Sequence, residues 1–263
     1  MYATLVAGLT ASLLTTPAAD PGRVSETSPF GPEQVKSATA TCPYGWVRYA
    51  GGGAVDYGPA GGSGVALTGI VPDAEGRSIT VTAAAPPGRP GGWALTAVAI
   101  CAESVEPRRI AEHGTGTVTA ECPGESSLFG LGFRVENGRV TEVTMDSGLR
   151  QVRVTASGPA EVTAIALCRP PAAEMRRVRA TGTHAGWPIT VSEQESDPAT
   201  RVYATGASVS GPANAALDAI VPGPDDGTSW ARATLIGSQG LRTAGDGDDG
   251  SVTLDAGRIG TFH

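Results

Sequence analysis

Short runs that alternate apolar or β-branched residues with polar ones recur along the chain. Residues 79–83 (ITVTA) and 151–156 (QVRVTA) alternate in this way between stretches that contain Gly and Pro. A period of two with β-branched residues is typical of a strand buried on one face. Residues 93–101 and 161–168 are apolar on both faces, which predicts interior strands. No ten-residue segment shows a convincing helical period, so the sequence predicts an all-β protein.

The strand pattern repeats. Residues 95–101 (LTAVAIC) match residues 162–168 (VTAIALC), and the six residues from Leu67 (LTGIVP) match the six from Leu217 (LDAIVP). Leu67, Val140 and Leu217 begin corresponding segments that are 73 and 77 residues apart. We therefore expect three tandem β repeats of about 75 residues, the third of them degenerate.

The repeats divide the chain. The predicted parts are a signal peptide (1–19), a flexible leader (20–35), and three β repeats (36–104, 105–170 and 171–263). Repeats that cannot each bury a core need their neighbours, so we expect one domain with pseudo-threefold symmetry. Three separate small β-sandwiches are the alternative arrangement.

The chain has four cysteines, and the repeats suggest how they pair. Cys42 and Cys122 each precede a proline, whereas Cys101 and Cys168 each end a strand. An even number of cysteines in an exported chain indicates disulfides, with zinc as the alternative, although no CxxC pair is present. Pairing within repeats predicts the bonds Cys42–Cys101 and Cys122–Cys168.

The N-terminal residues resemble an export signal. Leu5–Leu14 is mostly apolar and is followed by TTPAAD, with small residues before Asp20. This is typical of the apolar region and cleavage site of a secretory signal, although no Lys or Arg precedes it. A buried N-terminal strand or helix is the alternative. The expected location is therefore secreted and extracellular.

Glycines interrupt one strand in each repeat. Gly51–Gly53 lies inside a strand-like run, and Gly130, Gly132 and Gly206 lie at corresponding places in the other repeats. Glycine inside a strand marks a bulge or a close approach of another backbone. We expect close packing of strands across a boundary between repeats, with a ligand lying on the bare backbone as the alternative.

Composition excludes several classes of protein. The 263 residues carry a net charge of −7, which argues against the basic surface that nucleic-acid binding uses. No apolar run of 18 residues follows the N-terminus, so no membrane span is expected. At 40% hydrophobic residues the chain is too apolar to be simply disordered, despite its 37 glycines and 20 prolines.

The pattern CPxGxxxxxGGG from Cys42, followed later by an alternating strand that ends AIC, resembles a module of uncharacterised secreted proteins of actinobacteria. The resemblance covers residues 38–103 and, less closely, 116–170, where GLG replaces GGG. The third repeat lacks both cysteines. The resemblance implies an exported β protein held by disulfides and carries over no catalytic residue.

No catalytic residue is assigned from the sequence. His113 and His184 lie in linkers, and His263 ends the chain. The GxSxG motif of serine hydrolases is absent. Paired carboxylates can hydrolyse glycosides, but sequence alone cannot place any two across a cleft. The candidate acids are Glu121, Glu136, Glu142 and Asp218.

Two other features suggest binding. Asp246, Asp248 and Asp249 lie in a Gly-rich loop that would suit calcium, although the spacing is not that of an EF-hand. A solvated turn is the other interpretation of this loop, and no other cofactor is expected. Trp46 and Trp187 lie near loops and are the better candidates among the tryptophans for stacking on a sugar, although core packing is the expected role of each.

These features predict a secreted, non-enzymatic β-repeat protein that acts as a binding or structural module at the cell surface or in the medium. The expected partner is a polysaccharide, cell-wall material or another extracellular protein. The alternatives are a secreted hydrolase of unrecognised type and a protein-interaction or inhibitor module.

Overall fold

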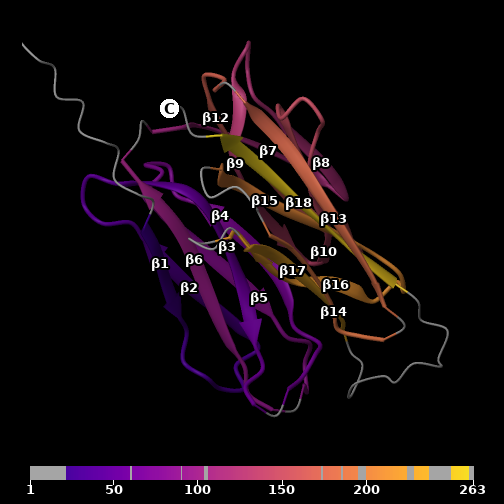
Figure 1. Ribbon diagram of the computed structural model, residues 1–263. Coiled ribbons are helices and arrows are strands. Elements are labelled where there is room, and N and C mark those ends of the chain that lie inside the picture. The colour runs from indigo at the N-terminus through magenta and orange to yellow at the C-terminus, as the bar shows by residue number, and fades with distance from the viewer. Residues whose placement is uncertain are drawn as a thin grey trace, which may run out of the picture.

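The computed structural model describes residues 22–59, 61–89, 91–103, 106–172, 174–184, 186–194, 200–223, 228–236 and 250–260. These residues form eighteen β-strands and no helix, which confirms the all-β prediction (Figure 1). No helix in this part of the chain is therefore long and apolar enough to cross a membrane.

Each third of the chain contributes six strands. Repeat 1 contains β1 (Gly22–Thr27), β2 (Val35–Thr41), β3 (Val47–Asp56), β4 (Ala66–Pro72), β5 (Ser78–Ala84) and β6 (Ala94–Ala102). Repeat 2 contains β7 (Arg108–Thr115), β8 (Thr117–Glu121), β9 (Ser127–Glu136), β10 (Arg139–Met145), β11 (Gln151–Ser157) and β12 (Glu161–Arg169). Repeat 3 contains β13 (Met175–His184), β14 (Ile189–Gln194), β15 (Thr200–Ser210), β16 (Ala215–Val221), β17 (Thr228–Leu235) and β18 (Gly250–Gly260).

The three repeats share one topology. In repeat 1 the strands pair in the orders β1-β6-β3 and β2-β5-β4, as two three-stranded halves. Repeat 2 has the corresponding halves β7-β12-β9 and β8-β11-β10, and repeat 3 has β13-β18-β15 and β14-β17-β16. The third segment is therefore a true structural repeat, although it lacks cysteines.

Each six-stranded sheet joins a half of one repeat to a half of another. The joining pairs are β3 with β16, β9 with β4, and β15 with β10, all antiparallel. The repeats thus close a ring with pseudo-threefold symmetry, as predicted, and separate sandwiches are not formed. We call each joining pair of strands a seam.

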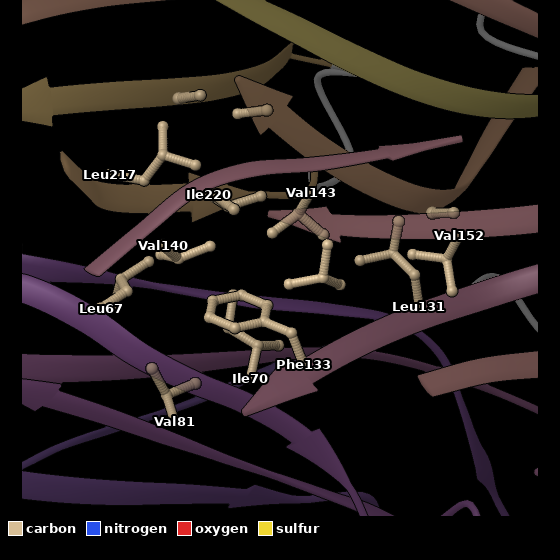
Figure 2. Packing of buried hydrophobic residues seen from close by; sticks show 14 of the residues in the cluster. Leu67, Ile70, Val81, Leu131, Phe133, Val140, Val143, Val152, Leu217 and Ile220 are labelled. Atoms are coloured by element: carbon tan, nitrogen blue, oxygen red, sulfur yellow. The ribbon is translucent and has the colours of Figure 1, made fainter. Parts of the chain in front are cut away.

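The core at the centre of the ring is built from equivalent residues (Figure 2). The strands β4, β10 and β16 contact one another there. Each carries two fully buried aliphatic side chains, which form the triplets Leu67, Val140, Leu217 and Ile70, Val143, Ile220. Burying each such side chain contributes about 1.5–3 kcal/mol, and the sequence match that begins at Leu67 is thereby confirmed as structural equivalence.

Glycine permits the close approach of strands at every seam. A Cβ on Gly132 would lie 2.5 Å from the carbonyl oxygen of Ile70, closer than real Cβ contacts allow. Gly52 and Gly206 occupy the equivalent places, against the carbonyl oxygens of Ile220 and Val143. The expected close packing between repeats is confirmed.

Both predicted disulfides are present. Cys42 is bonded to Cys101 and Cys122 to Cys168, over sequence separations of 59 and 46 residues. Closing loops of this length stabilises the folded state by about 4 kcal/mol each, through the lower entropy of the unfolded chain.

In repeat 3 a buried arginine stands where the other repeats have the second cysteine of the disulfide. Cys101, Cys168 and Arg258 occupy equivalent positions, each paired with the residue that precedes a one-residue bulge on the neighbouring strand. The buried Arg258 forms an ion pair with Glu193 of β14, which corresponds to the strands that precede Cys42 and Cys122. A charge pair therefore joins the two halves of this repeat.

The expectation of a flexible leader is wrong for residues 22–27. These residues form β1, which pairs with β6 along its whole length, and Gly31 bridges to Trp93. Val24 packs against the core, and β1 satisfies the backbone groups of β6, which would otherwise be an open edge. The predicted signal peptide lies outside the described residues.

Arg48, in β3 of repeat 1, is another buried cation. It occupies the place of Leu128 in repeat 2, and no described hydrogen bond uses its guanidinium. Burial lowers the pKa of Arg48 to about 10, and the charge of Asp73 opposes this shift only in part. The Asp73 carboxylate instead accepts hydrogen bonds from Arg77 and Ser78.

We expect Arg48→Leu to raise the free energy of unfolding by about 1 kcal/mol or more, because an apolar side chain removes an unpaired buried charge. Urea denaturation at pH 7 measures this, with the exposed Arg153→Leu as a control close to wild type. The stabilisation should shrink above pH 10, where Arg48 loses its charge in the folded state before it does so in the unfolded state. A loss of stability in Arg48→Leu would contradict this account.

Gly132→Ala should destabilise the protein by about 1–3 kcal/mol, because its Cβ would push β9 away from β4 at the seam. The control is Gly182→Ala on β13, where the nearest atom to a Cβ would be at an ordinary 3.4 Å. Thermal unfolding compares the two variants, and equal melting temperatures would show that the seam tolerates separation.

Candidate functional site

One end of repeat 1 departs from the symmetry. At the end opposite its disulfide, the connections β1–β2, β3–β4 and β5–β6 have seven, nine and nine residues. The corresponding connections of repeat 2 have one, two and three residues, and those of repeat 3 have four, four and fourteen, the last lying almost entirely outside the described residues. We call the three long connections of repeat 1, residues 28–34, 57–65 and 85–93, the loop end.

Two of these connections enclose a pocket of about 220 Å³. Its lining residues come from both, and they are Pro32, Gln34, Ala85, Pro86, Gly88, Arg89, Gly91 and Trp93. Trp93 is fully buried beneath the pocket, and its Nε1–H donates a hydrogen bond to the Glu33 carbonyl (2.9 Å). Register places the small Ala160 at the position of Trp93 in repeat 2.

Phe30 forms an aromatic surface beside the pocket. Its ring rests on Gly58 and Gly92, so that a Cβ on Gly58 would lie 3.1 Å from the ring and one on Gly92 still closer. The side chain is nevertheless 59% exposed. Two connections thus hold the ring in place without covering it.

Arg89 is held in the pocket from several sides. Its Nε–H donates to the Ser63 carbonyl (2.9 Å) and its Nη1–H to the Gly91 carbonyl (3.1 Å). The guanidinium also lies over the Tyr57 ring, 5.1 Å from its centroid. The connection 57–65 therefore positions the only charged group of the pocket lining.

A buried polar network supports Arg89 from across a seam. The Tyr57 hydroxyl donates to Oδ2 of Asp218 (3.0 Å), and Arg232 Nε–H donates to Oδ1 (2.9 Å). Burial raises the pKa of Asp218, and this shift is opposed by the charge of Arg232 and by the hydrogen bonds from Arg232 and Tyr57. Burial and the Asp218 charge raise the pKa of Tyr57, so its hydroxyl remains a donor.

At the equivalent bulges of the other two repeats, an uncharged threonine stands in place of Asp218. Asp218 is the one-residue bulge of β16, and Arg232 lies opposite it on β17. The equivalent bulge residues are Thr68, which donates to the Thr82 hydroxyl, and Thr141, which donates to a backbone carbonyl. Among the three bulges, the charged pair occurs only where the strand across the seam, β3, runs into a lengthened connection.

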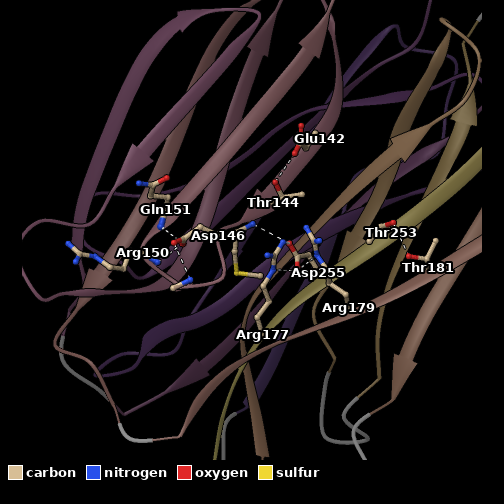
Figure 3. A network of polar contacts seen from close by, with 12 residues as sticks. Glu142, Thr144, Asp146, Arg150, Gln151, Arg177, Arg179, Thr181, Thr253 and Asp255 are labelled. Carbon is tan, nitrogen blue, oxygen red and sulfur yellow. Dashed lines mark hydrogen bonds and ion pairs between the residues drawn. The ribbon is translucent and has the colours of Figure 1, made fainter.

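A second buried carboxylate has a structural explanation (Figure 3). Asp255 on β18 accepts two hydrogen bonds from Arg177 (2.6 and 2.5 Å), lies 3.5 Å from Arg179 and accepts from the Met145 N–H (3.2 Å). The apolar Ile165 stands at the equivalent place in repeat 2. Both oxygens of Asp255 are satisfied, so this cluster ties β13, β18 and β10 together.

The residues that the sequence singled out for binding lie elsewhere. Trp46 is half-buried at the disulfide end, with its ring near Gly22. Trp187 is buried in the core, so its ring is not the exposed stacking surface that its loop position suggested. Asp246, Asp248 and Asp249 lie outside the described residues, and among the described ones no three potential metal ligands cluster.

The candidate acids and histidines whose side chains the structure describes do not come together as a catalytic group. Each described acid has its own partner: Glu121 faces Arg150, Glu136 pairs with Arg134, Glu142 accepts from Thr144 and Thr155, and Asp218 binds Arg232. His113 bonds to Thr163 on an exposed face. The His184 side chain and His263 are not described.

Sequence reasoning missed Phe30 and Arg89. Phe30 lies in the segment expected to be a leader. Arg89 lies in the run APPGRPGG, whose Gly and Pro residues indicate only a connection between two strands. A comparison of connection lengths between aligned repeats would have found both, because repeat 1 alone inserts residues at three adjoining places.

No protein-family model matches the chain, and no curated protein matches it. The resemblance to actinobacterial secreted modules therefore stays a prediction, and the candidate site depends on its own geometry.

Removing Arg232 should leave a charged Asp218 buried without its main partner. We expect Arg232→Met to lower the free energy of unfolding by about 3–5 kcal/mol at pH 7. Because Asp218 then binds a proton more tightly in the folded than in the unfolded state, the loss should diminish as the pH falls toward 4. Chemical denaturation at both pH values measures this difference.

The control for that experiment is Arg134→Met, which breaks an exposed ion pair with Glu136. An exposed pair contributes about 0–1 kcal/mol, so the control should stay close to wild type at both pH values. A similar loss in the two variants would show that Asp218 does not depend on Arg232.

Proposed function

We propose that the protein is an extracellular, non-enzymatic binding module that holds a polysaccharide at the loop end of repeat 1. The observation that carries this proposal is the local break in symmetry. Only repeat 1 has all three of these connections lengthened. Two of them line one pocket, and the third accepts a hydrogen bond from Arg89 and lies under the exposed ring of Phe30. Loops on a rigid scaffold are the usual carriers of recognition.

The composition of the site favours a sugar ring. Phe30 presents a fixed aromatic face, and Pro32 and Pro86 add apolar surface at the pocket. The exposed Gln34 amide and the Arg89 guanidinium supply hydrogen-bond groups that can orient hydroxyls. The pocket is smaller than the roughly 300–1,000 Å³ of sites for larger ligands, which suits one ring of a chain.

Two further points support export and a non-enzymatic role. Disulfides persist in oxidising compartments, and both disulfides here tie the two halves of a repeat. Asp218 is the carboxylate of the network that supports Arg89, but it is buried, accepts a hydrogen bond from Tyr57 and pairs with Arg232. It is therefore a support for the site and not a group that can exchange protons with a substrate.

Phe30→Ala should weaken binding to the polysaccharide about tenfold, because it removes the surface on which the sugar ring stacks and leaves the fold intact. Co-sedimentation with insoluble cell walls, chitin and cellulose measures this, with and without calcium. Wild type should pellet saturably on at least one matrix.

The matched control is Tyr44→Ala, because Tyr44 is an aromatic residue of the same repeat, 93% exposed, at the disulfide end. It should bind like wild type. Equal losses in both variants would contradict the location of the site. If wild type pellets with none of the matrices, the proposal of a polysaccharide ligand is contradicted and a protein partner is favoured. If pelleting depends on calcium, binding through the loop at 246–249 is favoured.

A further inference from the structure

The pocket carries a positive charge in an acidic protein. Arg89 is the one charged residue of its lining, whereas the chain as a whole has a net charge of −7. Two nearby carboxylates are already paired with cations. Glu33 accepts a hydrogen bond from Lys36 Nζ (2.6 Å), and Asp218 is paired with Arg232.

Arg89 also has donors left for a ligand. A guanidinium has five N–H groups, and the described hydrogen bonds from Arg89 to Ser63 and Gly91 use two of them. The remaining three are on Nη1 and Nη2, the two nitrogens that bind a carboxylate side by side. Backbone carbonyls and the Tyr57 ring already fix the Arg89 side chain. Binding of a ligand therefore costs little additional side-chain entropy.

We propose that the pocket binds the carboxylate of an acidic saccharide, with Arg89 as the residue that recognises it. This inference rests on the proposed function and names its ligand class. The sugar ring lies on the surface formed by Phe30 and the prolines, and its carboxylate accepts hydrogen bonds from Arg89. Gln34 lies on the same lining and can bind a neighbouring hydroxyl.

Repeat 2 provides an internal comparison. Its β11–β12 connection has three residues, Gly158, Pro159 and Ala160, and offers no charged side chain. A carboxylate site therefore belongs to the lengthened connection of repeat 1, and one site per chain is expected among the described connections of these two repeats.

The test compares polygalacturonate with the same polymer after its carboxylates are reduced to alcohols, using affinity electrophoresis of the full chain. Wild type should bind polygalacturonate at least tenfold more tightly than the reduced polymer, and added salt should narrow that difference. Arg89→Gln should lose the preference, Arg89→Lys should retain part of it, and Arg134→Gln should keep it entire.

The ligand comparison needs no variant, so it stands even if Arg89→Gln disturbs the loops. If both polymers bind equally well and Phe30→Ala loses this binding, recognition of the carboxylate is contradicted and the proposed function still holds. Equal binding of poly-glutamate would overturn the saccharide. Absence of binding to both polymers and to every insoluble matrix would overturn the proposed function as well.

Discussion

The architecture depends on how closely two backbones approach at the seams. Each seam is made by only two pairs of opposed residues, such as Ile70 with Phe133 and Gly69 with Arg134. So short a ladder holds only if the strands pack tightly, and this is why glycine stands at Gly132 and at its two equivalents. Each sheet is continuous because its seam closes, and the central core forms because all three close at once.

That closure explains how repeat 3 folds without a disulfide. Its two halves belong to two different sheets, each anchored to another repeat through β15 and β16. The ion pair of Arg258 with Glu193 is a directional contact inside a framework that the neighbouring repeats already hold. A covalent bond at this place is therefore replaceable, whereas an isolated repeat would need one.

Much of the fold could be predicted from the sequence, because it rests on patterns that repeat. The alternation of β-branched residues predicts the strands, and the segments that begin at Leu67 and Leu217 predict the equivalence that also pairs the cysteines. β1 could not be predicted, because GRVSET carries one apolar side chain and its stability comes from the edge of β6. Trp187 is buried in the core, in agreement with the core packing expected for it ahead of stacking.

Unequal connection lengths could have located the candidate site, but the contacts that build it could not be predicted. The network that supports Arg89 runs from Tyr57 in repeat 1 to Asp218 and Arg232 in repeat 3, so it requires the closed seam. Threonines suffice at the equivalent bulges, where the strand across the seam, β9 or β15, runs into a short connection. A buried ion pair costs desolvation that a threonine pair does not, and such a pair at this one bulge indicates that holding the loop end rigid outweighs that loss. The symmetric part of the molecule accounts for its stability, and the departures from symmetry are where binding is to be sought.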